Sequence, residues 1–142
     1  MKFALCNEVF QEMSIKDGFS KIAEIGYQGV EIAPFTLKDN PLEINEEDAA
    51  LCLEAANSAG IEIVGLHWLM AKSEGLHLTS SDQGMRDATC EYLQKLAKLT
   101  GQMGGSIMVL GSPPQSNLEC GPGFVGGGAV WGWKNSGGGG GG

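Results

Sequence analysis

The chain is poor in basic residues and contains no long apolar run. Its 142 residues include 9 lysines and arginines against 17 aspartates and glutamates, so the formal net charge is −8 at pH 7. An acidic chain argues against sequence-independent nucleic-acid binding, which needs a basic surface to displace counterions from phosphate. No apolar run approaches the ~20 residues of a membrane span. The apolar start at Met1–Cys6 is ended by Asn7 and Glu8 before it resembles a signal peptide. We therefore expect a cytoplasmic protein with neither nucleic-acid nor membrane partners.

Several signatures of cofactor and nucleophile chemistry are also missing. No G-x-G-x-x-G follows the first predicted strand, and the sequence contains no G-x-x-x-x-G-K-[ST] and no G-x-S-x-G, so dinucleotide, phosphate-loop and serine-nucleophile sites have no support. The four cysteines are far apart, with no C-x-x-C pair: Cys6, Cys52, Cys90 and Cys120. This spacing favours reduced thiols over disulfides or a zinc site. His67 and His77, the two histidines, do not have a familiar zinc spacing either.

Glycine is concentrated at one end of the chain. Roughly half of the 23 glycines follow Ser112, and residues 137–142 are all glycine. Glycine has no side chain to bury and loses the most backbone entropy on ordering. We therefore expect a folded part over residues 1–112 and an irregular glycine-rich tail over residues 113–142.

Within residues 1–112, apolar segments alternate with helical segments. The expected strands are Lys2–Phe10, Gly29–Ala33, Ile61–Leu66 and Ser106–Leu110. The expected helices run from Ser14 or Asp17 to Gly26, from Asn45 to Gly60, and from Ser81 or Asp82 to about Met103. Short connections and nearly continuous apolar strands favour a parallel sheet with right-handed crossovers.

Two α/β folds fit this order of elements. A flavodoxin-like open sheet usually places its site at one switch point, whereas here polar or small residues follow every predicted strand. We therefore prefer a partial (β/α)8 TIM barrel of about four β/α units. A complete barrel takes about 250 residues, so four units make about half of one.

Polar residues at the predicted strand ends are the candidate site. In parallel α/β folds, active sites form at the carboxyl ends of the strands. We expect Glu31 and His67 to share one opening there, with Asn7 and Glu8 beside them. A carboxylate in an apolar strand is costly to desolvate unless it is paired or faces a wet site. Glu31 is thus either an acceptor for substrate hydroxyls or part of a rim ion pair.

The residues of the third strand end also allow more than one role. His67 either binds a substrate oxygen or a metal, or is a satisfied core histidine. Trp68 offers either a flat wall for the carbon face of a sugar or plain packing. For Asn7 and Glu8, a hydrogen-bonding role at the rim and a substrate-binding role are both open.

Three segments carry a resemblance to a known family. Tyr27–Phe35, Gly65–Trp68 and Met108–Pro113 resemble the sugar phosphate isomerase/epimerase family, whose members have the xylose isomerase-like TIM barrel. The resemblance covers roughly residues 1–118 and suggests the N-terminal half of such an enzyme. It implies isomerisation or epimerisation of small sugars, sugar phosphates or hydroxy-ketoacids, in which a carboxylate removes a proton next to a carbonyl. It also implies a divalent metal (Mn, Mg, Co or Zn) in the full-length family.

The resemblance places the metal-binding and proton-transferring residues mainly on strands 5 to 8, which have no counterpart here. After Pro114 the family pattern gives way to the glycine-rich tail, as in a truncated or frame-shifted chain. We therefore expect no catalytic residue, no metal ligand and no bound metal in this chain, and no activity of the isolated chain. The expected substrate-binding residues are Glu31, His67, Glu8, Asn7 and Trp68.

Other interpretations remain open from the sequence. One is a fragment of an apurinic-site endonuclease-like zinc hydrolase, which Gly111-Ser112 at the fourth strand end and the acidic charge disfavour. Another is a non-catalytic binding half-barrel. Because a half-barrel leaves two sheet edges exposed, we also expect self-association through those edges.

Overall fold

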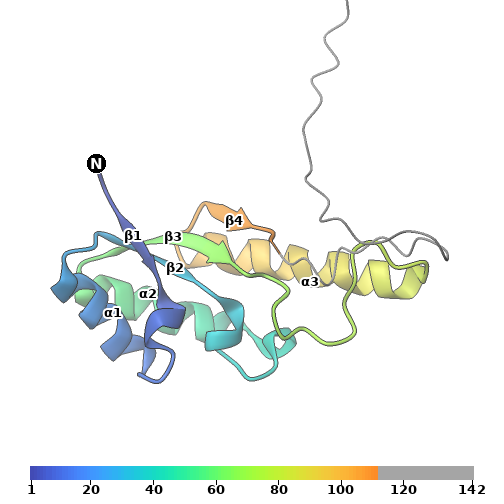
Figure 1. The fold of residues 1–142 in the computed structure, drawn as a ribbon, viewed down its shortest axis with the longest axis horizontal. Helices are drawn as coiled ribbons and strands as arrows, with labels where there is room; N and C mark the ends of the chain where they lie inside the picture. Colours follow the sequence, from blue (N-terminus) through green and yellow to red (C-terminus); the bar gives the residue numbers. More distant parts are fainter. Residues whose placement is uncertain (112–142) are drawn as a thin grey trace, which may run out of the picture.

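The computed structural model describes residues 1–111, which form a four-stranded parallel sheet and three α-helices (Figure 1). The strands lie side by side in chain order: β1 (Ala4–Cys6), β2 (Gly29–Ile32), β3 (Glu62–His67) and β4 (Ile107–Val109). They are connected by α1 (Ile15–Ile25), α2 (Glu46–Ala59) and α3 (Gln83–Gln102). The structure therefore confirms the predicted fold class, a part of a (β/α)8 barrel. The predicted tail over residues 113–142 lies outside the described residues.

The helices begin and end at the signals that the sequence contains. The Ser14 hydroxyl accepts a hydrogen bond from the backbone N–H of Asp17 at the start of α1. Asn45 and Asp48 form a reciprocal capping box at the start of α2. Gly26 and Gly60 follow α1 and α2 with φ values of 103° and 70°, a left-handed conformation that glycine adopts without steric strain. Local sequence thus fixes where each β/α unit turns back toward the sheet.

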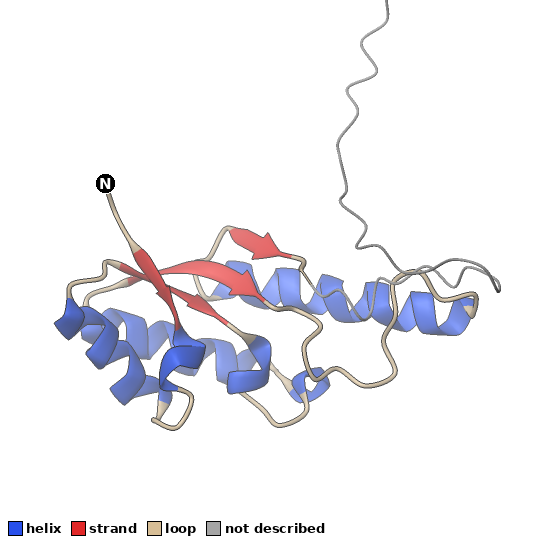
Figure 2. Ribbon diagram, viewed as in Figure 1, coloured by secondary structure: helices blue, strands red, loops and turns tan. Residues whose placement is uncertain are grey.

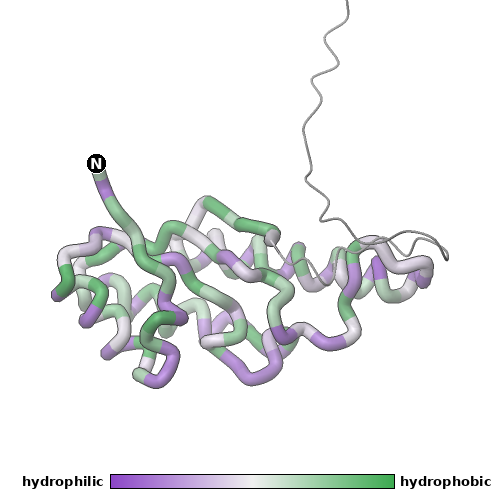
Figure 3. The backbone as a smooth tube through the Cα atoms, viewed as in Figure 1, coloured by the Kyte–Doolittle hydropathy of each residue, from purple (hydrophilic) through white to green (hydrophobic). Residues whose placement is uncertain are grey.

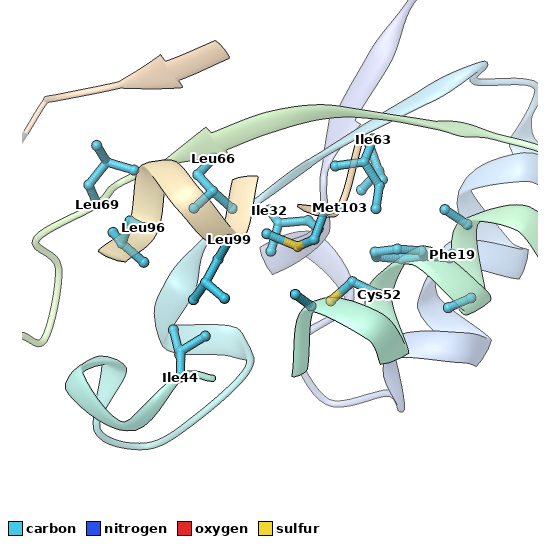
Figure 4. Packing of buried hydrophobic residues seen from close by; sticks show 14 of the residues in the cluster. Phe19, Ile32, Ile44, Cys52, Ile63, Leu66, Leu69, Leu96, Leu99 and Met103 are labelled. Carbon is cyan, nitrogen blue, oxygen red and sulfur yellow. The ribbon is translucent and has the colours of Figure 1, made fainter. Parts of the chain in front are cut away.

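The hydrophobic core lies between the sheet and the helices. Figure 2 shows the strands along one side of the molecule and the helices gathered on the other. Ile32 and Leu66 of the sheet, Phe19 of α1, Cys52 of α2 and Leu99 of α3 are all at most 2 % exposed (Figure 4). Burial of apolar surface contributes about 25 cal/mol per Å². This layer is therefore the main stabilising contact of the described part.

The opposite face of the sheet has no helix over it in residues 1–111. Along β4, Met108 packs against the core, whereas Ile107 and Val109 are about half exposed, at 49 % and 47 %. Figure 3 shows β4 as a hydrophobic segment at the margin of the molecule. In a complete barrel this face of the sheet is the interior. The polar side chains on this face therefore lie on the side that a complete barrel encloses.

A β-bulge in β3 sets which side chains reach that face. Val30 pairs with Ile63, but the next residue, Glu31, pairs with Gly65, so Val64 is an extra residue. Ile63 and Leu66 both lie in the core although they are three positions apart, and regular alternation would place them on opposite faces. The bulge therefore brings His67 to the same face as Glu31.

The first strand is shorter than the sequence predicted. Residues 2–10 were expected to form one strand, but β1 ends at Cys6, and Asn7–Phe10 forms a 3-10 turn. The reason lies in the Asn7 side chain, whose Oδ1 accepts a hydrogen bond at 2.9 Å from the backbone N–H of Ala33. This side chain takes the place of the next backbone pairing between β1 and β2. None of the helices in residues 1–111 is long and apolar enough to cross a membrane.

Candidate functional site at the carboxyl ends of the strands

Side chains from the first three strands converge where those strands end. Cys6 and Glu31 occupy paired positions on β1 and β2, and the Cys6 thiol donates a long hydrogen bond, 3.8 Å, to Oε2 of Glu31. The same oxygen lies 3.8 Å from Nδ1 of His67, at the end of β3. Glu31 and His67 therefore lie together at one opening, as the sequence predicted. Their roles toward a substrate stay predictions.

Glu8 holds the other nitrogen of the imidazole. Oε2 of Glu8, in the turn after β1, lies 2.9 Å from Nε2 of His67. In the neutral ring, a carboxylate at this distance keeps the proton on Nε2, because the carboxylate can only accept. Nδ1 then carries a lone pair. It is buried, and no hydrogen-bond partner for it lies within the described residues.

The charge around the imidazole is negative. The Glu8 and Glu31 side chains are about one-third exposed, at 31 % and 34 %, whereas that of His67 is 6 % exposed. Within residues 1–111, no lysine or arginine forms an ion pair with either carboxylate. Burial, followed by the charges of Glu31 and Glu8, raises the pKa of Cys6 from 9.0 to about 11. The thiol is therefore protonated at neutral pH.

Asn7 acts as a clamp between the first two units. Its side chain is buried; Oδ1 accepts from the Ala33 backbone and Nδ2 donates to Thr36 Oγ1 at 2.7 Å. Thr36 in turn donates to the carbonyl of Ala33 at 2.7 Å. These contacts match the hydrogen-bonding role at the rim, which is one of the two roles that the sequence left open for Asn7. A contact between Asn7 and a substrate stays a prediction.

Trp68 lies at the rim beside His67 and is 54 % exposed. Its ring meets that of Phe35 edge to face, with 6.3 Å between the centroids, and Lys72 Nζ lies 4.6 Å from the centre of the Phe35 ring. Trp68 and Lys72 both have positive φ values, 54° and 58°, which are strained for residues with a Cβ. The loop after β3 thus holds an exposed aromatic surface next to the polar cluster.

Sequence reasoning missed one member of the cluster. Cys6 was treated as an ordinary thiol of the first strand, yet its register opposite Glu31 brings it to the site. Strand alternation could have indicated this, because Leu5 packs against the core and Cys6 must then face the other way. His77 belongs instead to the following loop, where Nδ1 accepts from the backbone N–H of Thr79 at 3.3 Å.

The donor set of the cluster fits a metal ion. Cys6, Glu31 and His67 each offer one possible ligand atom, and these three atoms lie within 4.8 Å of one another. Thiolate, imidazole and carboxylate are together the ligands of zinc and similar ions, whereas magnesium and manganese prefer oxygen ligands alone. The buried lone pair on Nδ1 is directed at the same place, because the opposite nitrogen is held by Glu8.

Comparison with known proteins decides the family. The sequence profile described as "Xylose isomerase-like TIM barrel" matches residues 19–135, which is most of the chain. The chain belongs to the xylose isomerase-like TIM barrel family. The match confirms the family-level prediction and fits the parallel β/α order of the sheet.

A solved structure has a similar fold. The crystal structure of a D-psicose 3-epimerase in the presence of D-fructose is similar in fold, with a TM-score of 0.58 and 17 % sequence identity. The similarity covers 76 % of this chain but 36 % of the epimerase chain. The chain thus spans about a third of the length of that epimerase. No curated protein sequence matches it.

Proposed function

We propose that this chain provides the substrate-binding strand ends of a sugar isomerase or epimerase. The substrate would be a small sugar, a sugar phosphate or a hydroxy-ketoacid, and the reaction a metal-assisted proton transfer next to a carbonyl. The observation that carries the proposal is the convergence of Glu8, Glu31 and His67 at the carboxyl ends of parallel strands. Family membership and the similarity to D-psicose 3-epimerase support it.

Each side chain of the site has a different role in binding a polyhydroxylated ligand. Glu31 is partly exposed, so its carboxylate oxygens can accept hydrogen bonds from sugar hydroxyls. Nδ1 of His67 is a second acceptor, directed to the same place. Glu8 touches His67 and positions it by keeping the ring proton on Nε2. Trp68 offers an apolar face beside these acceptors, on which the C–H groups of a sugar ring pack.

The catalytic part of the reaction is not assigned to residues of this chain. A divalent metal, when bound, draws electron density from the oxygens next to the reacting carbon and makes its proton more acidic. The carboxylate that removes this proton is expected on later strands of the barrel, as in the family pattern. We therefore propose that the isolated chain binds sugar weakly and does not turn it over.

Two measurements on the full 142-residue chain test this function. Backbone amide NMR spectra are recorded during titration with D-fructose, for the wild-type chain and for Glu31→Gln, Trp68→Ala and the control His77→Gln. We expect shifts at the ends of β1, β2 and β3 in the wild type and the control, and at least tenfold weaker binding in the other two. Equal binding by all four chains, or shifts scattered over the surface, would refute the substrate site.

The second measurement concerns turnover. The chain is incubated with D-fructose in D2O with Mn²⁺ or Co²⁺, and deuterium incorporation at carbon is followed by mass spectrometry. No incorporation is expected, because the proton-transferring residue is absent from the assigned set. Incorporation by the wild type that is lost in Glu31→Gln would show that the chain is catalytic by itself. It would overturn the proposal that the isolated chain binds sugar without turning it over.

A further inference from the structure

We propose that Cys6, Glu31 and His67 form a zinc-binding site at the carboxyl ends of the first three strands. The site is separate from the later-strand metal site that the family pattern implies. It uses two of the side chains proposed for substrate binding, Glu31 and His67, but its test needs no sugar. It also departs from the sequence-based expectation that this chain holds no metal. The argument rests on distances, on the orientation of the imidazole and on the local charge.

The distances between the donor atoms are close to those around a tetrahedral ion. Oε2 of Glu31 lies 3.8 Å from Sγ of Cys6 and 3.8 Å from Nδ1 of His67. Zinc bonds of about 2.0 to 2.3 Å in tetrahedral geometry place ligand atoms about 3.3 to 3.8 Å apart. The ligand atoms of all three residues lie within 4.8 Å of one another, so side-chain shifts of up to about 1 Å would bring them into a ligand shell.

The orientation of His67 is already that of a metal ligand. Metal-binding histidines usually donate their second ring N–H to a carboxylate, which fixes the tautomer and makes the free nitrogen more basic. Glu8 does this here at 2.9 Å, and Nδ1 is left buried and without a partner in the described residues. A buried lone pair without a partner is costly. An ion at this point supplies the missing interaction.

The charge of the pocket also favours a cation. Glu8 and Glu31 flank the imidazole, and no lysine or arginine pairs with them within residues 1–111. A divalent ion bound to the Glu31 carboxylate and the Cys6 thiolate balances both charges. Binding displaces the thiol proton of Cys6, which passes to the buffer, so one proton is released for each zinc bound. Three protein ligands leave a fourth position for water or for a hydroxyl group of a ligand.

The test uses the full 142-residue chain with Cys90→Ser and Cys120→Ser, which removes the exposed thiol of α3 and the thiol outside the described residues. Zinc binding is measured by competition with a chromophoric chelator, and Co²⁺ is used as a spectroscopic probe without any sugar present. We expect one ion per chain, one proton released, and a thiolate-to-cobalt charge-transfer band. Cys6→Ser should abolish the band and weaken zinc binding at least tenfold.

Two further variants separate this site from unspecific binding. Glu8→Gln should weaken zinc binding about 10- to 100-fold, because it removes the carboxylate that orients His67. His77→Gln, in the neighbouring loop, should leave binding unchanged. Equal affinity in Cys6→Ser and the parent chain, or the absence of the cobalt band from a folded chain, overturns the proposal.

X-ray absorption spectroscopy of the zinc-loaded chain keeps the test decisive if a variant fails to fold. The proposal requires one sulfur neighbour together with nitrogen or oxygen neighbours. A shell of nitrogen and oxygen alone, or the lack of any stoichiometric zinc, excludes the site. In the metal-free chain, ¹⁵N NMR of the imidazole should show the proton on Nε2. Protonation of both nitrogens that persists with zinc would instead identify a His67 imidazolium bridging the two carboxylates, and would refute the metal site.

Discussion

Gly65 of β3 lies so close to Ile107 of β4 that a Cβ atom at position 65 would overlap the backbone carbonyl of Ile107. These two residues are also partners in the β3–β4 register. The fourth strand can therefore join the sheet only because position 65 has no side chain. The same glycine stands opposite Glu31, two residues before His67, so the close approach of the strands occurs within the candidate site.

Substitution of this glycine should separate the two strands. We expect Gly65→Ala to lower the free energy of unfolding by about 3 kcal/mol, because overlap with backbone atoms cannot be relieved by a rotamer change. Gly101→Ala in α3 is the matched control, since a Cβ there meets nothing within 4 Å. It should stabilise the chain by about 0.5 to 1 kcal/mol. Urea denaturation measures both, and similar midpoints for the two variants would contradict the packing described.

The Asn7 clamp should make a large contribution to stability. Asn7→Ala leaves the backbone N–H of Ala33 without its acceptor and Thr36 without its donor. A buried unsatisfied group costs about 1 to 3 kcal/mol, so we expect a loss of about 2 kcal/mol in urea denaturation. Asn57→Ala, on the exposed side of α2, should change stability by less than about 0.5 kcal/mol. Equal losses at the two positions would show that the clamp has no special role.

Stability should fall at alkaline pH. Burial, with a smaller effect of the Asp48 charge, raises the pKa of Cys52 from 9.0 to about 12, and the pKa of Cys6 is raised to about 11. The folded chain keeps these protons after the unfolded chain has lost them. The stabilisation is therefore complete below pH 9 and is lost as the pH rises toward 11 to 12. Each such group contributes a slope of up to about 1.4 kcal/mol per pH unit.

Cys52→Ala separates this effect from general alkaline unfolding. Its free energy of unfolding, measured in urea between pH 8 and pH 11, should fall less steeply than that of the wild type, whatever its stability at neutral pH. Cys90→Ala, at an exposed position of α3, should keep the wild-type slope. A slope that Cys52→Ala leaves unchanged would mean that this thiol does not titrate in the range expected.

The uncovered face and the outer edge of β4 should promote self-association, which remains a prediction of the sequence and of the fold. In residues 1–111, β4 pairs with β3 alone, and Val109 is 47 % exposed. A lysine on an edge strand hinders pairing with another chain. Val109→Lys should therefore lower the apparent mass in size-exclusion chromatography with light scattering. Leu51→Lys, on exposed α2, is the control of equal charge, and a wild-type chain that elutes as a sharp monomer would refute the prediction.

The sequence predicted the elements well where local chemistry determines them. Asn45 caps α2 as expected, and Ser14 and Asp82 are each one of the two caps that the sequence allowed for α1 and α3. Glycines at positions 26 and 60 end α1 and α2. Such signals act within one turn of the chain, so they can be read without knowledge of the fold.

The parts that escaped prediction depend on contacts between distant segments. β1 ends early because Asn7 bonds to Ala33, 26 positions away. Cys6 joins the site because of its register opposite Glu31. The bulge at Val64 is signalled in the sequence only by Gly65, which indicates a bulge or a close backbone approach without distinguishing the two. Parallel pairing joins residues across whole helices, and hydrophobic alternation in short apolar strands is too weak to fix such a register.

The bulge has a consequence for changes in the length of β3. Deletion of Val64 would restore an unbroken ladder, with Gly65 still facing Glu31 and the imidazole still at the opening. Deletion of Leu66 would move His67 into the vacated place and turn the ring toward the helices. The two single-residue deletions would therefore have opposite effects. Deletion of Val64 would leave the opening unchanged, whereas deletion of Leu66 would remove the imidazole from it.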